Sequence, residues 1–428
     1  MQRIRIWVAV AMGLATALLG ACGGNSNSNS SASIRVVNAT LTHPTLTLLA
    51  NSNALVPATA SDTASPYSSV DSGGPTLQLN DGATGTALST LSPTLGGGSH
   101  YTLLAYENGG AVRTALISED TAAPSSSTAG LRVFNAATDA GALDVYVTDP
   151  AVDLATLSSP TFIFSSSNAT VGSSFLSFAP GTYRIRVTGS GNTSDVRLDI
   201  PSITLAGQQV ATAILTPTTG GILANGSFLI QQGAYTAVRN TSARVRLVAA
   251  VGGGPVVSAT SGTTSIATNV IAPTITAYKL VTAATPLGVT VNGSPIAAPT
   301  GTLAAGSDNT LVVYGSGAGT ATASLIADDN HLPTSASNVR MRLFNGLTGT
   351  APALTLSADF AVVASNAVPG TASAYAIIPS NTSMRLDVTS ATQSIYSESG
   401  LPVRGNAVYT LFMLGDASAP AHLLRSDR

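Results

Sequence analysis

The sequence predicts an all-β protein made of four tandem β-sandwiches. Charged residues make up only 9% of its 428 residues, against about 25% in an average soluble protein. Beyond the first twenty or so positions, however, no apolar run approaches the roughly 18 residues that span a bilayer. Ser, Thr, Asn and Gly interrupt the apolar stretches, as in strands that bury one face and hydrate the other. A strand motif that recurs four times supplies the number of units.

Residues 1–21 have the pattern of a lipoprotein signal peptide. Arg3 and Arg5 give a positive start, and residues 6–19 form an apolar core of suitable length. The segment 19–22, Leu-Gly-Ala-Cys, then resembles the bacterial lipobox. This resemblance implies that Cys22 is lipidated and that its acyl chains hold the protein on a membrane. The alternatives are an ordinary signal peptide with an incidental cysteine, or an N-terminal membrane anchor.

Residues 22–32 are predicted to be the lipidated Cys22 and a flexible tether, because the Gly, Asn and Ser that follow the cysteine offer nothing to bury. Gly23 stands where an Asp would resemble a signal for retention in the inner membrane. We therefore expect a lipid-anchored outer-membrane protein, with exposure to the periplasm or to the cell surface left open.

The recurring strand motif places an arginine between apolar residues and ends in Asn in three of its copies. A glycine-led strand follows each of these arginines after 60 to 75 residues, and a turn and a last strand come next. The motif copies are residues 34–38, 131–135, 245–249 and 341–345, and the glycines are Gly98, Gly207, Gly306 and Gly405. Two landmarks that keep a similar separation four times indicate a tandem repeat.

Residues 33–428 divide into four units of about 99 residues, the size of an immunoglobulin-like sandwich with about seven short strands. We predict Ig-like (transthyretin-like) antiparallel β-sandwiches at 33–122, 128–234, 241–331 and 336–428, with junctions at 122–128, 234–242 and 331–337. The second unit shows its strands most clearly, with period-two alternation in the strand 183–188. Its candidate strands are 131–135, 143–147, 161–164, 174–178, 183–188, 196–200, 210–215 and 227–230.

The second unit resembles the domain of unknown function 4397, a family found in exported bacterial proteins. The matching pieces are Leu-Arg-Val-Phe-Asn-Ala at 131–136, Ala-Leu-Asp-Val-Tyr-Val at 142–147 and Pro-Gly-Thr-Tyr-Arg-Ile-Arg-Val at 180–187. The other units resemble the family less closely, and the family usually shows a His where this chain has Asn38, Asn135 and Asn345. The resemblance implies a β-sandwich and an envelope location, and it implies no reaction.

The repeated arginines are the first candidates for a site. They are expected on a solvated strand face or paired with a carboxylate such as Asp144 or Asp387, and the alternative is that they line a ligand groove. The asparagines at the motif ends are expected to turn the chain, since Asn side chains readily bond nearby backbone. The four arginines are Arg35, Arg132, Arg246 and Arg342, and the three asparagines are Asn38, Asn135 and Asn345.

Acids that directly follow a last strand are the second candidates. Glu119-Asp120 and Asp328-Asp329-Asn330 could supply oxygens to a calcium ion between domains, although solvated linker charge is the favoured interpretation. Equivalent acids are absent after Ile230.

Other chemistry finds little support. The four histidines, His43, His100, His331 and His422, lack metal-ligand spacing and are expected to be isolated surface residues. The only lysine, Lys279, has no Ser three residues before it, and the glycine-rich segment 315–319 is expected to be a hairpin turn. We predict no catalytic, cofactor or metal residues, and a single modified residue, Cys22.

These observations predict a non-enzymatic cell-envelope lipoprotein that serves as a structural or ligand- or protein-binding module, adhesion being one such role. The alternative is a carbohydrate-binding or glycan-processing envelope protein, which the lack of exposed tryptophan candidates and of paired acids disfavours. A self-associating surface component is a third possibility. A net charge of −2 with one lysine argues against nucleic-acid binding. The identity of the protein or glycan partner, the domain arrangement and the oligomeric state are left open.

Overall fold

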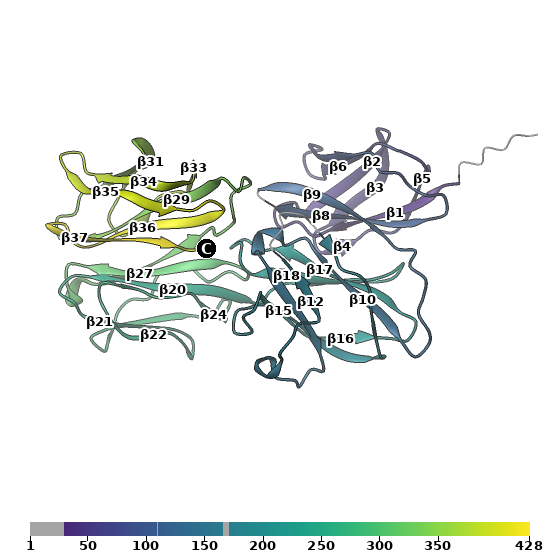
Figure 1. Ribbon diagram of the computed structural model, residues 1–428, viewed down its shortest axis with the longest axis horizontal. Helices are drawn as coiled ribbons and strands as arrows, with labels where there is room; N and C mark the ends of the chain where they lie inside the picture. The colour runs from purple at the N-terminus through teal and green to yellow at the C-terminus, as the bar shows by residue number, and fades with distance from the viewer. Residues whose placement is uncertain (1–29, 109, 166–170) are drawn as a thin grey trace, which may run out of the picture.

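A computed structural model describes residues 30–108, 110–165 and 171–428 (Figure 1). In this part of the chain the structure consists of β-strands and three short 3-10 helices, which confirms the all-β prediction. No helix among the described residues has the length and apolar character needed to cross a bilayer. The predicted signal peptide of residues 1–21, Cys22 and most of the predicted tether lie outside the described residues.

Each repeat forms a sandwich of two sheets. In sandwich 1 the larger sheet has the strand order β4-β1-β8-β9 with β5 also paired to β1, and the smaller sheet has the order β3-β2-β6-β7. The strands of sandwich 1 are β1 (Ala32–Asn38), β2 (Thr45–Ala50), β3 (Asn53–Ala60), β4 (Thr63–Ala64), β5 (Ser68–Val70), β6 (Leu77–Asp81), β7 (Ala87–Leu91), β8 (His100–Asn108) and β9 (Ala111–Ser118).

The other three sandwiches repeat this plan. Sandwich 2 comprises β10 (Ala129–Asn135), the 3-10 helix η1 (Thr138–Ala140), β11 (Leu143–Thr148), η2 (Leu154–Thr156), β12 (Phe162–Phe164), β13 (Val171–Gly172), β14 (Leu176–Phe178), β15 (Gly181–Gly189), β16 (Val196–Leu205), β17 (Val210–Pro217), β18 (Ala224–Ile230) and β19 (Tyr235–Val238). Sandwich 3 comprises β20 (Ser242–Val251), β21 (Val256–Ser261), β22 (Thr264–Ile271), β23 (Thr274–Ile275), β24 (Lys279–Thr282), β25 (Leu287–Val291), β26 (Ser294–Pro295), β27 (Asp308–Gly315), η3 (Ala318–Thr320) and β28 (Thr322–Asp328). Sandwich 4 comprises β29 (Asn338–Thr348), β30 (Leu354–Ala358), β31 (Ala361–Ala367), β32 (Thr371–Ala372), β33 (Ala376–Pro379), β34 (Asn381–Thr389), β35 (Ser394–Val403), β36 (Ala407–Asp416) and β37 (Ala419–Ser426).

The sandwiches are not purely antiparallel, in contrast to the prediction. In each larger sheet the motif strand pairs in parallel with the glycine-led strand, as β1 does with β8, β10 with β17, β20 with β27 and β29 with β36. The chain passes through the whole smaller sheet between these two strands, and it returns to the larger sheet running in the same direction. Residue patterning specifies which face of a strand is buried but not its direction, so the sequence could not reveal this pairing.

The junction predicted at 234–242 is only partly correct. β19 (Tyr235–Val238) lies within this segment and pairs with β18, so it extends the larger sheet of sandwich 2. All eight strands predicted for the second unit are present, and β13 and β19 are additional. The segment 315–319 connects the antiparallel strands β27 and β28 through a 3-10 turn, as expected for a hairpin connection.

The motif strand is buried on both of its faces, and this explains its apolar character. In β1 the side chains of Ile34 and Val36 enter the core of sandwich 1, while Arg35 and Val37 point to the opposite face. All four residues are at most 4% exposed. The outward face is covered by the neighbouring sandwich.

The four sandwiches associate as two pairs, and the pairs lie side by side (Figure 1). Sandwiches 1 and 2 bury a common apolar cluster that includes Val37, Leu104 and Ile214. Sandwiches 3 and 4 do the same around Val248, Phe344 and Phe412, which are at most 1% exposed. The chain therefore folds into a two-by-two arrangement and not into a rod of four domains.

Candidate functional site

The repeated arginine organises a cluster that recurs in all four sandwiches. Its Nε donates a hydrogen bond of 2.8–3.1 Å to the Oγ1 of a threonine directly opposite on the parallel glycine-led strand. Its guanidinium lies 4.5–4.8 Å from the centre of an aromatic ring. The four Arg, Thr and aromatic sets are Arg35, Thr102 and Tyr67; Arg132, Thr212 and Phe175; Arg246, Thr310 and Tyr278; and Arg342, Thr410 and Tyr375.

An acid at the end of the last strand completes this cluster in three of the sandwiches. In the second pair the ion pairs cross from one sandwich to the other, since Arg342 contacts Asp328 and Arg246 contacts Asp427. All four side chains are at most 3% exposed. Burial opposes the ionised form of Asp328, but Arg342 and Arg246 outweigh burial and lower the pKa of Asp328. The buried charges are thus matched across the interface.

In the first pair, sandwiches 1 and 2, the equivalent residues make different contacts. Arg35 binds Glu119 of its own sandwich at 2.7 Å and donates through Nη1 to the backbone oxygen of Gly233 in sandwich 2 at 2.6 Å. The carboxylate of Glu119 accepts a hydrogen bond from the backbone N–H of Gln232 at 2.6 Å. Sandwich 2 lacks the acid, because Gln231 stands at the position of Glu119 and its side chain bonds the backbone of Thr121. Among the described residues, Arg132 therefore has no carboxylate within ion-pair distance.

These contacts correct two of the expectations from sequence. The expected pairing with a carboxylate is confirmed for Arg35, Arg246 and Arg342. The partners are not the suggested Asp144 and Asp387, because Asp144 accepts bonds from Ser190 and Gly191 and Asp387 pairs with Arg385. Glu119 and Asp328 are not the solvated linker charges that we favoured, because both are buried between domains, where arginines face them. In the described part of the chain, no three acidic, His or Cys side chains gather in a way that would hold a metal ion.

The asparagines at the motif ends turn the chain, as predicted. The Oδ1 atoms of Asn38, Asn135 and Asn345 each accept a hydrogen bond from the backbone N–H two residues further on, at 3.0–3.2 Å. These bonds are formed where the chain leaves the first sheet for the second.

The histidines are not isolated, contrary to expectation. Each one lies within 3.3 Å of a carboxylate, in the pairs His43–Asp81, His100–Asp120, His331–Asp329 and His422–Glu398. His331 also contacts Asp139 of η1 through Nε2 at 3.3 Å, so it connects sandwich 2 to the junction between sandwiches 3 and 4.

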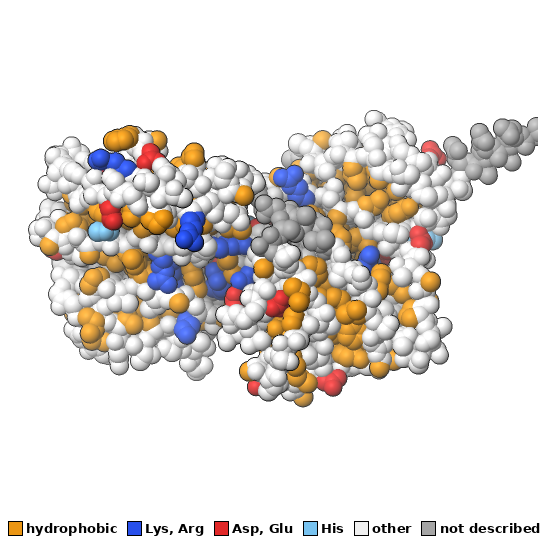
Figure 2. Space-filling model, viewed as in Figure 1, with side chains coloured by type: hydrophobic (Ala, Val, Ile, Leu, Met, Phe, Trp, Pro, Cys, Tyr) orange, Lys and Arg blue, Asp and Glu red, His pale blue; other side chains and the backbone are white. Residues whose placement is uncertain are grey.

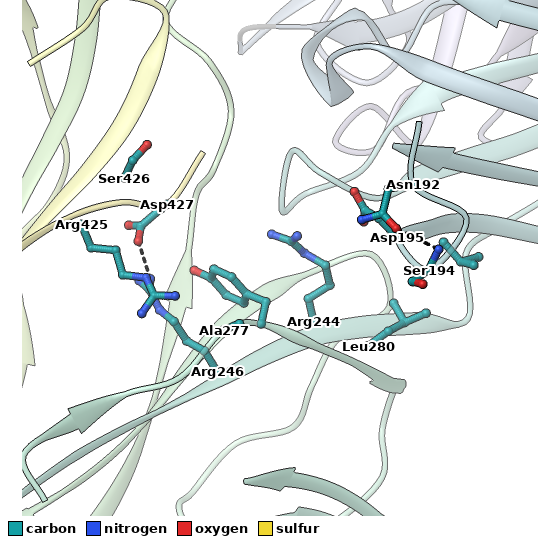
Figure 3. A pocket seen from close by; sticks show the side chains of 12 residues that line it. Asn192, Ser194, Asp195, Arg244, Arg246, Ala277, Leu280, Arg425, Ser426 and Asp427 are labelled. Atoms are coloured by element: carbon teal, nitrogen blue, oxygen red, sulfur yellow. Dashed lines mark hydrogen bonds and ion pairs between the residues drawn. The ribbon is translucent and has the colours of Figure 1, made fainter. Parts of the chain in front are cut away.

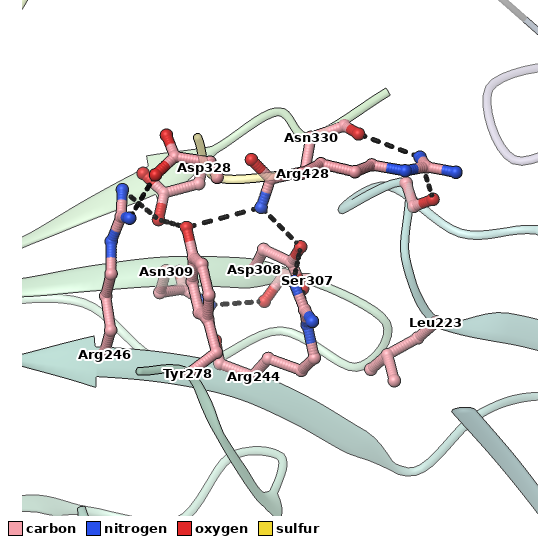
Figure 4. Close-up of polar contacts among 12 residues, drawn as sticks. Leu223, Arg244, Arg246, Tyr278, Ser307, Asp308, Asn309, Asp328, Asn330 and Arg428 are labelled. Carbon is pink, nitrogen blue, oxygen red and sulfur yellow. Dashed lines mark hydrogen bonds and ion pairs between the residues drawn. The ribbon is translucent and has the colours of Figure 1, made fainter. Parts of the chain in front are cut away.

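The boundary between the two pairs is rich in buried charge. Burial raises the pKa of Asp139, and burial lowers the pKa of Arg428 to about 10. Arg428 donates through Nη1 to the backbone oxygens of Gly221 and Asn330, both at 3.0 Å. Figure 4 shows that Asn330 extends these contacts into a network, because its side-chain amide donates to both Asp308 and Tyr278.

Arg244 anchors the opposite end of the network. Its Nε and Nη2 donate to the two carboxylate oxygens of Asp308 at 2.8 and 2.7 Å. Burial opposes the charge of Arg244, but the hydrogen bonds and the charge of Asp308 outweigh it and raise its pKa. Burial raises the pKa of Tyr278 well above its ordinary value, so its hydroxyl remains protonated and donates to Asp328 at 2.7 Å.

A hollow of about 350 Å3 opens beside this network, where sandwiches 2, 3 and 4 meet (Figure 3). We call it the basic hollow, because Lys and Arg side chains gather over sandwiches 3 and 4 next to the boundary (Figure 2). The loop between β15 and β16 forms one wall, the region around β20 and β24 forms the floor, and the end of β37 forms the other wall. It is lined by Asn192, Ser194, Asp195, Val196, Arg244, Arg246, Ala277, Tyr278, Leu280, Arg425, Ser426 and Asp427.

Of the residues in this region, the repeat in the sequence pointed to Arg246 but not to Arg244, Tyr278, Asp308 or Arg425. One signal was available, because a threonine stands four or five residues after each of the landmark glycines. The aromatic residues offered a second signal, because they follow the motif arginine by 32, 32 and 33 residues in the first, third and fourth units and by 43 residues in the second.

Together, the sheets and the paired sandwiches define a tandem β-sandwich protein. Residues 32–146 match a family described as Domain of unknown function (DUF4397), so the resemblance to this family is confirmed for that segment. The matched residues span sandwich 1 and only the first strands of sandwich 2, whereas we expected the closest resemblance in the second unit.

Solved structures with similar features share little sequence with the chain. A candidate cell adhesion protein from Bacteroides uniformis is 11% identical, with a TM-score of 0.21, over 48% of this chain and 99% of that one. A second candidate cell adhesion protein, from Bacteroides ovatus, is 9% identical with a TM-score of 0.13 over 71% of this chain and 97% of that one. A multi-modular glycogen-degrading pneumococcal virulence factor, SpuA, is 8% identical with a TM-score of 0.15, over 85% of this chain and 37% of that one. No curated protein matches the chain.

Proposed function

We propose that the chain is a non-enzymatic, lipid-anchored envelope protein whose four sandwiches form a ligand- or protein-binding module of the adhesive type. The observation that carries this proposal is the basic hollow, which draws its walls from three sandwiches at once. Such a site is available only when the sandwiches hold a fixed arrangement. The buried arginine clusters fasten sandwich 3 to sandwich 4. Arg428 and His331 in turn connect this pair to sandwich 2.

Anchoring through Cys22 is the second part of the proposal, and it is supported by the lipobox-like segment 19–22. A lipid anchor on a tether of residues 22–32 would present the paired sandwiches close to the outer membrane, toward the periplasm or the cell surface. Multiple acyl chains would hold firmly, because each buried methylene contributes roughly 0.8 kcal/mol.

The experiment combines mass analysis of the mature N-terminus with protease treatment of intact cells, using Cys22→Ala as the control. We expect an acylated Cys22 in the wild type and release of the Cys22→Ala protein from the membrane. Digestion on intact cells would place the sandwiches outside and direct the search to external partners. Protection would direct it to periplasmic partners. An unacylated cysteine would remove the anchoring part of the proposal.

Carbohydrate binding is the second candidate function, and the same hollow favours it. The lining combines charged, hydroxyl and amide groups with the apolar side chains of Val196, Ala277 and Leu280, and ligand pockets in general combine apolar surface with a few polar groups. A binding screen against cell-wall and host glycans, with protein partners captured in parallel, separates this function from protein binding.

A further inference from the structure

The charges in the basic hollow are not balanced, although its lining contains both arginines and acids. Asp195 pairs with Arg197 at 2.7 Å, and Asp427 pairs with Arg246. Arg244 is paired with Asp308. Each of these pairs is internally neutral, so neither acid is available to compensate a further cation.

Arg425 is the cation that remains. Its Nη1 donates to the backbone oxygen of Ile275 at 3.0 Å, and no carboxylate of the described residues lies within ion-pair distance of it. The backbone contact orients the side chain and leaves the other nitrogens free to donate. A guanidinium with free donors and no counter-charge matches a carboxylate in geometry and charge.

The rest of the lining suits hydroxyl groups more than a second anion. In Figure 3, Asn192, Ser194 and Asp195 lie on one side of the hollow and Arg425, Ser426 and Asp427 on the other, with Arg244 between them. The amide and hydroxyls can both donate and accept, and the paired carboxylates can accept from hydroxyl groups. The same carboxylates would repel a ligand that carries several negative charges.

We propose that the basic hollow binds an acidic sugar residue, with its carboxylate on Arg425 and its hydroxyls on Asn192, Ser194 and the free Nη1 of Arg244. The size of the hollow agrees with this class of ligand, since about 350 Å3 lies at the small end of ligand pockets. An uronic acid or a sialic acid has one carboxylate, several hydroxyls and a compact ring. This inference rests on the proposed binding function and names the ligand class for it.

The test is isothermal titration calorimetry of the full chain with glucuronic acid and N-acetylneuraminic acid, and with glucose as the neutral counterpart. The acidic sugars are expected to bind at least tenfold more tightly than glucose, because a charge-assisted hydrogen bond contributes that much. Arg425→Gln and Asn192→Asp should each weaken binding of the acidic sugars about tenfold or more. Asn192→Asp keeps the oxygen that accepts from the backbone of Ser194, so it changes the charge and not the local turn.

Arg404→Gln is the matched control. Arg404 is exposed, has no ion pair among the described residues and does not line the hollow, so its replacement should leave binding unchanged. Circular dichroism checks that each variant is folded, and Arg425→Lys is expected to recover part of the affinity if a variant proves unstable.

Equal binding of glucose, or unchanged binding by folded Arg425→Gln, would overturn the proposal. So would the absence of any binding of the acidic sugars, or binding in the hollow of an acidic peptide in their place. None of these results decides whether the chain is an anchored binding module, because that question is answered by the cell experiment and the partner capture.

Discussion

The crossed ion pairs of the second sandwich pair make a specific prediction for Arg342. Replacing this side chain by Met would leave the fully buried carboxylate of Asp328 without its closest cation, while Arg246 Nη2 lies 4.0 Å away. Removing one partner of a buried ion pair typically costs about 3–5 kcal/mol of unfolding free energy. We expect the cost of Arg342→Met to lie near the lower end of this range, about 3 kcal/mol. Urea denaturation of the full chain, followed through the transition of sandwiches 3 and 4, measures the loss.

Arg184→Met provides the comparison for this measurement. Arg184 and Asp199 form an ion pair whose side chains are 32% and 37% exposed, and solvent screens such pairs strongly. Arg184→Met should therefore lose several-fold less unfolding free energy than Arg342→Met. Equal losses for the two variants would contradict the assignment of Arg342 as a residue that holds the interface.

The missing acid of sandwich 2 leads to a stabilising substitution. Gln231→Glu would place a carboxylate at the position that Glu119 occupies in sandwich 1, near Arg132 and Thr212. Burial lowers the pKa of Arg132 at present, and a nearby anion would favour its charged form. We expect a gain of up to about 1 kcal/mol, reduced by the lost bond from Gln231 to Thr121.

Gln232→Glu tests the sign of this effect in a neighbouring position. The side chain of Gln232 donates to the backbone oxygen of Glu119 and to Asp120, so a carboxylate there would face like charge and lose its donor. Thermal unfolding should therefore shift upward for Gln231→Glu and downward for Gln232→Glu. A downward shift for both would show that Arg132 does not accept a carboxylate partner.

The sequence revealed part of the clusters at the level of single residues. Four arginines in equivalent strands were evident from the repeat, and the acids Glu119 and Asp328 were noticed as groups at strand ends. Their pairing was not evident, because Asp328 meets Arg342 only through the contact between two sandwiches. Interactions between separate folding units leave no periodic signal in the chain, whereas the turn at Asn38 is local and could be predicted.

At the level of the elements, the motif strand has two apolar faces for two different reasons. One face enters the core of its own sandwich, and the other packs against the neighbouring sandwich. The sequence showed the apolar character and the position of the strand, but it assigned the second face to solvent. The parallel pairing of β29 with β36 was missed because the partners are more than 60 residues apart.

Phe412 of β36 tests the coupling of sandwiches 3 and 4. Its ring belongs to sandwich 4, is 1% exposed and packs in a cluster with Val248 and Val312 of sandwich 3. Phe412→Ala should cost about 3–5 kcal/mol, as for other buried aromatic residues. Because the lost contacts join two sandwiches, the unfolding of the pair should become less cooperative in calorimetry. Leu423→Ala, at a side chain that is 46% exposed, should leave the transition nearly unchanged.

For the whole molecule, the sequence predicted four sandwiches in tandem but could not distinguish a rod from a folded-back arrangement. The contacts that fold the chain back join residues that are distant along the chain. Arg239 reaches Asp62 at 2.7 Å, and Arg428 reaches the backbone of Gly221. In the sequence such residues resemble ordinary surface charges, because nothing near them in the chain indicates the partner.

We expect the docking of the two pairs to depend on pH through His331. Burial opposes its charge, but the hydrogen bond to Asp329 and the charges of Asp139 and Asp329 outweigh burial and raise its pKa above the ordinary 6.5. Arg340 opposes this effect, and Arg428 is the other cation close to Asp139. A group with a raised pKa in the folded state stabilises that state fully below its unfolded pKa, and the contribution is lost as the pH rises through the folded pKa. Burial also raises the pKa of Asp139, so its contribution to the folded state is likewise complete below about pH 3.8 and declines as the pH rises.

The contact between the pairs should therefore be tighter at pH 6 than at pH 8.5. Hydrogen exchange of η1 and of residues 329–334, measured at both pH values and corrected for the intrinsic rate, should show less protection at pH 8.5. His331→Gln keeps a polar side chain but cannot become charged, so the protection in this variant should change much less with pH in this range than in the wild type. Protection that falls with pH equally in the wild type and in His331→Gln would exclude His331 as the origin of the effect. Such a result would leave the buried Asp139 as the titrating group, since its charge would then lack a matching cation when it ionises.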